Sequence, residues 1–315
     1  MKLILGTMTF GQQVEKEIAK EMCTMFLSKG FHEVDTAYVY NDGKCEKMIG
    51  EILPALEAYD VQLATKVNPR VTGRLDKEAV DMQIKESLER MNVTKVDTLY
   101  LHFPDYNTPI ESALEAVNSW YEKKTFKRLG LSNFPAWLVI DVLAKCEKNG
   151  WVKPSVYEGL YNVLGRNVER ELFDALHAYH ISFHAYNPLA GGLLTGKYKG
   201  YETAPEAGRF KCRPTYHKRY WKKSYFDAVK VIQNACDEHG ISIVTAAIKW
   251  LAYHSELKVE NGDGIIMGAS SCLQLEQNIN GLNGDKLPEA VVNAMEEAWE
   301  LCKADSPEYF RYYGV

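Results

Sequence analysis

The stretch Phe31-His32-Glu33-Val34-Asp35-Thr36-Ala37-Tyr38-Val39-Tyr40 sets the pattern that decides the fold. Residues 31–34 read as a short strand that ends in a polar segment. An amphipathic helix is expected on either side of it, over 15–29 and over 45–53. A strand placed between two helices is the unit from which parallel sheets are built.

The same alternation continues along the chain in both directions. We expect strands at 3–5, 31–34, 61–65, 96–101, 127–131, 155–159, 181–185 and 264–267. We expect helices at 15–29, 45–53, 76–91, 111–124, 136–149, 168–179, 225–239, 242–254, 272–282 and 288–303, with a long polar loop over 191–213. Eight parallel strands are the number that closes a barrel. The sequence therefore predicts an α/β fold, a (β/α)8 TIM barrel with additional C-terminal helices, in a single domain over residues 1–315.

Composition excludes several classes of function. The net charge of −5 argues against a nucleic-acid partner. The seven cysteines have no zinc spacing, so we expect reduced thiols and no metal site. No apolar stretch approaches the length of a membrane span, and the first residues lack the apolar core of a signal peptide. We therefore expect a cytoplasmic protein that does not bind membranes.

Polar residues follow the expected strands where active-site residues of such barrels lie, at the C-terminal strand ends. They include Asp35, Tyr40, Lys66 and His102. A phenol is a weak acid with a pKa of about 10, and a neighbouring ammonium group lowers that pKa. Lys66 is expected to act in this way on Tyr40, Asp35 to hold Lys66, and His102 to orient a carbonyl. Taken singly, Asp35 also suits a helix cap and His102 a buried core histidine, so the joint arrangement carries the interpretation.

At these residues the sequence resembles the aldo-keto reductase superfamily over nearly the whole chain. The resemblance rests on Asp35-Thr36-Ala37-x-x-Tyr40, Ala64-Thr65-Lys66, Leu99-Tyr100-Leu101-His102, Gly130-Leu131-Ser132-Asn133 and the segment Tyr186–Tyr198. Within the superfamily it is similar to the branch of aflatoxin-aldehyde and succinic-semialdehyde reductases. The features shared with that branch are Leu101-His102-Phe103-Pro104-Asp105 and Ser306-Pro307-Glu308-Tyr309-Phe310-Arg311.

The resemblance implies an NADPH-dependent reductase of aldehydes and reactive dicarbonyls, in which Tyr40 is the general acid. Tyr186 would stack on the nicotinamide, and Ser132 and Asn133 would hold its carboxamide. The loop over 187–197, including Asn187, Leu189, Gly191, Gly192 and Lys197, would line the pyrophosphate. The adenosine end would meet Arg209, Ser270, Gln274, Gln277 and Asn278. Lys197 and Arg209 suit a 2′-phosphate, which favours NADPH over NADH.

One position departs from the family pattern. Relatives carry Gln in the motif of the sixth strand, whereas here Tyr157 is followed by Glu158. An ionised carboxylate accepts hydrogen bonds but cannot donate one to the carboxamide oxygen. We therefore expect an altered cofactor affinity or pH dependence, unless Glu158 pairs with a nearby cation.

The substrate pocket is expected above the nicotinamide. Its candidate walls are Met8, Tyr40, His102, Tyr216, Arg219 and Tyr220. The resemblance makes Arg219 and Arg311 candidate residues for binding a substrate carboxylate such as that of succinic semialdehyde.

The alternative function is an NADPH-binding regulatory subunit resembling the potassium-channel β-subunits. His102 argues against it, because that group carries Asn at this position. The branch is often dimeric, which favours a homodimer.

Overall fold

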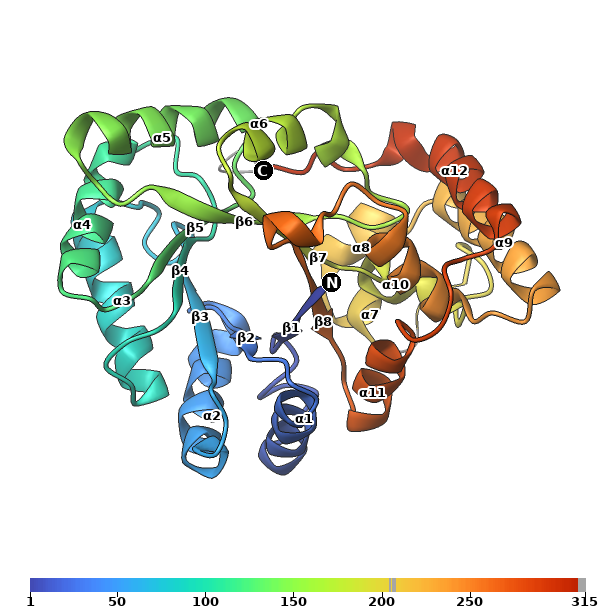
Figure 1. Cartoon of the computed structure of the whole chain (residues 1–315), viewed down its shortest axis with the longest axis horizontal. Helices are drawn as coiled ribbons and strands as arrows, with labels where there is room; N and C mark the ends of the chain where they lie inside the picture. The colour runs from blue at the N-terminus through green and yellow to red at the C-terminus, as the bar shows by residue number, and fades with distance from the viewer. Residues whose placement is uncertain (204, 206–207, 311–315) are drawn as a thin grey trace.

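Eight parallel strands form a closed barrel in which each strand pairs with the next and β8 pairs with β1 (Figure 1). This computed structural model describes residues 1–203, 205 and 208–310. The strands are β1 (Lys2–Gly6), β2 (Glu33–Asp35), β3 (Gln62–Val67), β4 (Thr98–Leu101), β5 (Arg128–Ser132), β6 (Pro154–Leu160), β7 (Ser182–Tyr186) and β8 (Gly264–Gly268). The predicted (β/α)8 architecture is confirmed.

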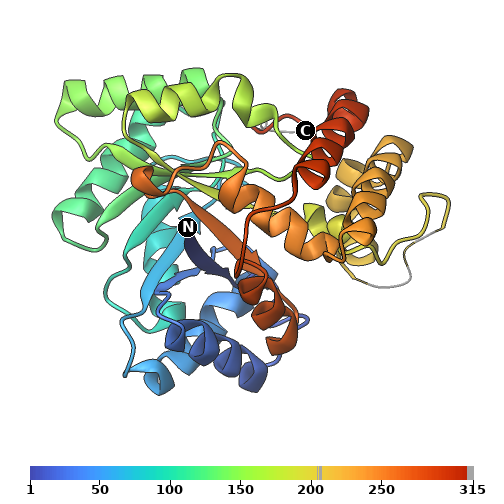
Figure 2. The same ribbon diagram turned by 45° about the vertical axis from the view of Figure 1, so that its right-hand side comes forward.

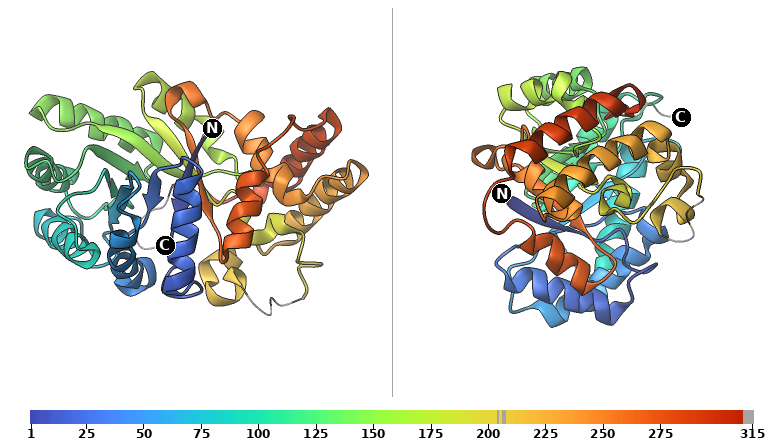
Figure 3. Two further views of the ribbon diagram at one scale, coloured as in Figure 1. Left: turned by 60° about the horizontal axis from the view of Figure 1, so that its bottom comes forward. Right: turned by 90° about the vertical axis from the view of Figure 1, so that its right-hand side faces the viewer.

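Most of the helices surround the barrel on its outer face, with α9 and α12 side by side at one edge, and the short α7 and α8 lie at the C-terminal strand ends (Figures 2 and 3). They are α1 (Lys16–Ser28), α2 (Lys44–Ile52), α3 (Lys77–Met91), α4 (Ile110–Glu122), α5 (Ala136–Asn149), α6 (Leu172–Ala178), α7 (Arg209–Cys212), α8 (Pro214–Tyr220), α9 (Lys223–Glu238), α10 (Ile243–Tyr253), α11 (Cys272–Asn280) and α12 (Glu289–Cys302). Across the described part of the chain, none of them has the length and apolarity to cross a bilayer.

Apolar side chains from the strands and helices pack in the layer between the barrel and its helices, which is the main core. A second, smaller cluster of Ala64, Tyr100 and Val156 is separate from this core. These three residues belong to β3, β4 and β6, so they fit the barrel interior. The Tyr100 ring needs a glycine at position 130, because a Cβ there would lie 2.2 Å from a ring carbon. The small residues therefore make room for one large ring.

The expected strands and helices are all present, with ends that differ by a few residues. The main difference lies in the stretch predicted as a loop, 191–213. It contains the 3-10 turn Ala190–Thr195 and the short helix α7. Gly191 and Gly192 have positive φ angles, which interrupt the helical backbone. This is why the sequence predicts a loop here.

Candidate active site

A large cavity of about 1170 Å³ opens at the C-terminal ends of the strands. Residues at or just beyond the end of each of the eight strands line it, because parallel strands present the same end to one rim. They include Thr7, Tyr40, Asn68, His102, Asn133, Glu158, Tyr186 and Ser270. The candidate catalytic and cofactor residues therefore meet at one place.

Lys66 is completely buried behind the lining residues Asp35 and Glu158. Its ammonium donates to Asp35 Oδ1 and, at 2.8 Å, to the carbonyl oxygen of Thr36. The same Nζ lies 5.3 Å from the centre of the Tyr40 ring. The His102 ring meets the Tyr40 ring edge-on, with centroids 6.0 Å apart. The four predicted catalytic residues are thus in one cluster.

The electrostatic environment of Tyr40 differs from the sequence-based expectation. Burial, followed by the carboxyl groups of Asp35 and Glu158, raises the pKa of the Tyr40 phenol well above its usual value. The expected net lowering of this pKa by Lys66 is not found, because burial raises the pKa and two carboxyl groups already engage the ammonium. Tyr40 therefore keeps its proton. A phenol with a raised pKa can still protonate an alkoxide, which is a much stronger base than a phenolate.

Glu158 is the second carboxyl group beside Lys66. Its side chain is nearly fully buried, lines the cavity and places Oε2 at 3.2 Å from Lys66 Nζ. The alternative left open by the sequence, that Glu158 pairs with a nearby cation, is therefore observed. Burial and the neighbouring Asp35 nevertheless raise the pKa of Glu158 to about 8. In its neutral form the side chain can both donate and accept a hydrogen bond, as a glutamine amide does.

His102 is held in one orientation by Asn68. The Oδ1 atom of Asn68 accepts from the backbone N–H of Arg70 at 2.9 Å, so its Nδ2 faces His102 Nδ1 at 3.2 Å. Burial, with smaller contributions from Lys66 and Arg70, lowers the pKa of His102 well below its usual value. A neutral ring that accepts at Nδ1 carries its proton on Nε2. Nε2–H is then available to a substrate carbonyl oxygen.

Tyr186 and Asn133 form the wall beside the catalytic cluster. The Tyr186 hydroxyl donates to Asn133 Oδ1 at 2.7 Å, which fixes the tyrosine ring. Asn133 Nδ2 donates to the His102 carbonyl oxygen and to Ser132 Oγ. Ser132 is fully buried and is not among the lining residues, so the structure places it behind Asn133 and away from the predicted carboxamide contact.

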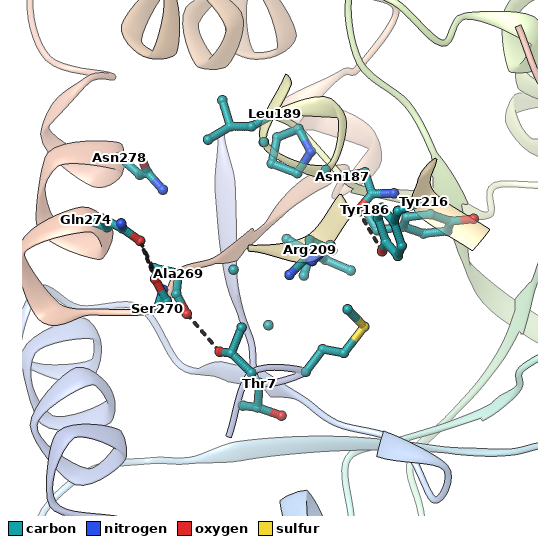
Figure 4. A pocket seen from close by; sticks show the side chains of 18 of the residues that line it. Thr7, Tyr186, Asn187, Leu189, Arg209, Tyr216, Ala269, Ser270, Gln274 and Asn278 are labelled. Carbon is teal, nitrogen blue, oxygen red and sulfur yellow. Dashed lines mark hydrogen bonds between the residues drawn. The ribbon is translucent and has the colours of Figure 1, made fainter. Parts of the chain in front are cut away.

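The cavity continues from this wall towards the N-terminal end of α11. Figure 4 shows Ser270 and Gln274 on one side, Tyr186 and Tyr216 on the other, and Arg209 between them. The remaining predicted cofactor residues also line the cavity: Asn187, Leu189, Gly191, Gly192, Lys197, Gln277 and Asn278. Lys197 and Arg209 form no ion pair within the residues described. Their positive charges are therefore available to an anionic ligand.

Two further features of the lining fit a dinucleotide. Asn187 Nδ2 is a buried polar atom of the lining that has no hydrogen-bond partner within the described ranges. Gly192 has a φ of 104°, and a Cβ added to it would meet nothing within 4 Å, so the chain there leaves open space. A cavity with an unmatched polar atom and cations that form no ion pair within the described residues is suited to a phosphate-bearing cofactor.

The predicted substrate residues divide into three groups. Met8, Tyr216 and Arg219 line the cavity. Tyr220 does not line it: the side chain is fully buried, and its hydroxyl accepts from Asn162 at 3.3 Å. The interpretation of Tyr220 as a pocket wall is therefore corrected, because this side chain packs beneath α8. Arg311 lies outside the described residues.

Sequence reasoning missed Asn68 and Arg70, which both line the cavity after β3. A signal for Asn68 was present, because residues two apart on a strand share a face and Lys66 points inward. The Arg70 guanidinium lies over the Phe103 ring, 4.5 Å from its centre, and Phe103 stacks on His102 at 4.7 Å. No sequence pattern marks this stack, which depends on two neighbouring loops.

Comparison with known proteins agrees with this geometry. The sequence profile of the aldo/keto reductase family matches residues 2–300. The chain belongs to this family. Among its relatives, aflatoxin B1 aldehyde reductase member 2 from Homo sapiens is 40% identical over 98% of this chain and 89% of its own length. Aldo-keto reductase family 7 member A3 from Homo sapiens is 38% identical, over 98% of this chain and 96% of its own.

A fungal relative extends the comparison. An aldo-keto reductase from Pseudocercospora fijiensis is 39% identical over 89% of this chain and 97% of its own length. Members of the family generally use NADP(H). This aldo-keto reductase is accordingly an NADP-dependent oxidoreductase, and its similarity to aldehyde reductases spans the strands that build the cavity.

Proposed function

We propose that this chain reduces aldehydes and reactive dicarbonyls to alcohols with NADPH, and that Tyr40 supplies the proton. The observation that carries the proposal is the cluster of Tyr40, Lys66 and His102 at one end of the cavity. The same cavity holds the cations Lys197 and Arg209, which suit a 2′-phosphate. A proton donor and cations for a phosphate in one cavity match the chemistry of NADPH.

Each residue of the cluster has a separate task. NADPH, when bound, supplies a hydride to the carbonyl carbon. His102 Nε2–H donates to the carbonyl oxygen and orients it, and Tyr40 gives that oxygen its proton as the charge develops. Lys66, held by Asp35, fixes the position of the phenol and provides positive charge beside the phenolate that remains.

We further propose a preference for aldehydes that carry a remote carboxylate, such as succinic semialdehyde. Arg219 on α8 lines the cavity, and its guanidinium lies 5.4 Å from the Tyr216 ring centre. In the ranges that the structure covers, no carboxylate lies within ion-pair distance of Arg219. A partly buried arginine that lacks an anion in its own chain suits a substrate anion.

The test is steady-state oxidation of NADPH with a panel of aldehydes. 2-Carboxybenzaldehyde and succinic semialdehyde are compared with their uncharged analogues, and NADH is run beside NADPH. We expect turnover with both kinds of aldehyde and a higher kcat/KM for the acids. Tight NADPH binding without turnover of any aldehyde would instead support the regulatory alternative. Equal kcat/KM for acids and neutral analogues would remove the carboxylate preference alone.

A further inference from the structure

Two carboxyl groups share one ammonium beneath the cavity. Lys66 Nζ donates to Asp35 Oδ1 and lies 3.2 Å from Glu158 Oε2. All three side chains are almost completely buried. If both carboxyl groups were ionised, this buried cluster would carry a net negative charge, which is costly in a medium of low polarity. A proton retained on one of them makes the cluster neutral.

Glu158 is the member of the pair that suits this proton. Burial raises the pKa of Asp35 as well, but Asp35 accepts the hydrogen bond of the ammonium, which opposes this effect and favours its ionised form. Glu158 Oε2 lies within ion-pair distance of the ammonium but forms no hydrogen bond of good geometry within the described part of the chain, and the side chain lines the cavity. Burial and the charge of Asp35 raise the pKa of Glu158 to about 8, so the side chain is mostly neutral at pH 7.

The remaining titratable groups around Glu158 do not change charge near neutral pH. Burial raises the pKa of Tyr40, Tyr100 and Tyr186 above the usual value, and the phenols stay protonated. Burial lowers the pKa of His184, which neighbours Glu158 on β7, and that of His102, so both rings stay neutral. Lys66 keeps its charge, because the two carboxyl groups raise its pKa despite the opposing effect of burial.

This arrangement has a consequence for the two redox forms of the cofactor, and it rests on the proposed function. Hydride must be delivered to a carbonyl whose oxygen lies at Tyr40 and His102, so the nicotinamide must lie beside that pair. Glu158 lines the cavity at the same end, together with Asn133 and Tyr186. The oxidised nicotinamide ring carries a positive charge, whereas the reduced ring is neutral. We propose that Glu158 is a redox-linked proton site: it keeps its proton when the reduced ring is bound and releases it to solvent when the oxidised ring is bound.

The direction of the pH dependence follows from this linkage. Below a pH of about 8 the neutral Glu158 accommodates either ring. As the pH rises through that value, the carboxylate forms and favours the oxidised ring. The affinity for NADP⁺ relative to NADPH should therefore rise with pH, by about tenfold for each unit by which the oxidised ring lowers the pKa of Glu158. Both cofactors carry the same phosphates, so the ratio of their dissociation constants cancels phosphate titration.

The experiment is calorimetric titration of the full chain with NADP⁺ and with NADPH at pH 7. Buffers with different ionisation enthalpies give the number of protons released on binding. We expect NADP⁺ to release roughly half a proton more than NADPH, and we expect the ratio of dissociation constants to change about tenfold between pH 6 and pH 9. Glu158→Gln should abolish the difference and the pH dependence of the ratio. Glu171→Gln removes a carboxylate outside the cavity lining and should change neither quantity.

The outcomes separate this inference from the proposed function. Binding of both cofactors with equal proton release in the wild type would overturn the redox-linked site alone. An unchanged difference in Glu158→Gln would also overturn it, because another group would then carry the proton. Binding of neither cofactor would overturn the proposed function and this inference together. The binding of NADPH by Glu158→Gln reports that the variant is folded, and the loss of a protonated carboxyl band in the infrared difference spectrum with NADP⁺ provides a second measurement in the wild type.

Discussion

The amide nitrogen of Asn68 lies 3.2 Å from Nδ1 of His102 and fixes the ring nitrogen that faces the substrate. The amide cannot turn over without loss, because its oxygen already accepts from the backbone N–H of Arg70. A neutral histidine can donate from one nitrogen only. Asn68 therefore acts as a positioning residue for His102 and lies two residues beyond Lys66, just after the end of β3.

Asn68→Asp should weaken this arrangement. A carboxylate accepts and cannot donate, so it draws the histidine proton to Nδ1 and turns the acceptor nitrogen towards the substrate. We expect kcat/KM to fall about 10- to 100-fold, with NADPH affinity nearly unchanged. Nitrogen NMR of the His102 ring should show the proton moving from Nε2 to Nδ1. A fall in rate without this change of tautomer would assign Asn68 a merely structural role.

Arg219→Leu tests the substrate preference. Removal of the guanidinium should raise KM for carboxylate-bearing aldehydes about 10- to 100-fold and leave KM for neutral aldehydes within about twofold. Lys218→Leu is the matched control, because Lys218 is exposed, neighbours Arg219 on α8 and does not line the cavity. If KM rises equally for neutral and charged aldehydes in the Arg219 variant, the arginine supports the shape of the pocket and does not bind the carboxylate.

Lys197→Gln tests the choice between NADPH and NADH. Its ammonium is free of ion pairs within the described residues and lines the cavity near Arg209. We expect the dissociation constant of NADPH to rise about tenfold and that of NADH to stay nearly constant, since only NADPH carries the 2′-phosphate. Lys199→Gln serves as the control, because Lys199 is absent from the lining. Equal losses for both cofactors would place Lys197 at the pyrophosphate instead.

His184→Gln should alter the acid stability of the barrel. Burial lowers the pKa of His184 well below its usual value of about 6.5, so the unfolded chain takes up the proton first as the pH falls. The free energy of unfolding then declines below pH 6.5, by at most about 1.4 kcal/mol per pH unit for this group. Denaturant unfolding at pH 6.5 and pH 5.5 should show a smaller decline in the variant. An identical decline in both proteins would contradict the assignment.

The fold and the cluster could be predicted from the sequence because both depend on local patterns. Alternating strands and helices identify the barrel, and polar residues at the strand ends identify the rim. The raised pKa of Tyr40 could not be predicted, because it depends on burial and on Asp35 and Glu158 meeting at Lys66, which only closure of the sheet brings about. The alternation of side chains between the two faces of a strand also fails at the end of β5. Asn133 has a φ of 61° and lines the cavity, whereas Ser132 does not line it.

The same limit applies to the short helix α8. Arg219 and Tyr220 are sequence neighbours, and neighbours on a helix point in different directions. Arg219 reaches the cavity and Tyr220 packs beneath it. This helix falls in a region whose sequence has no clear apolar period, so the side of the helix that faces the cavity could not be predicted.

The most direct test of the account is the rate of a single turnover in Tyr40→Phe, measured with NADPH and 4-nitrobenzaldehyde beside the dissociation constant of NADPH. The variant removes the proton and leaves the ring in place, so we predict a fall in rate of about 10²–10⁴-fold with the dissociation constant within about twofold of the wild type. A rate close to that of the wild type, with NADPH bound normally, would contradict the assignment of Tyr40 as the proton donor.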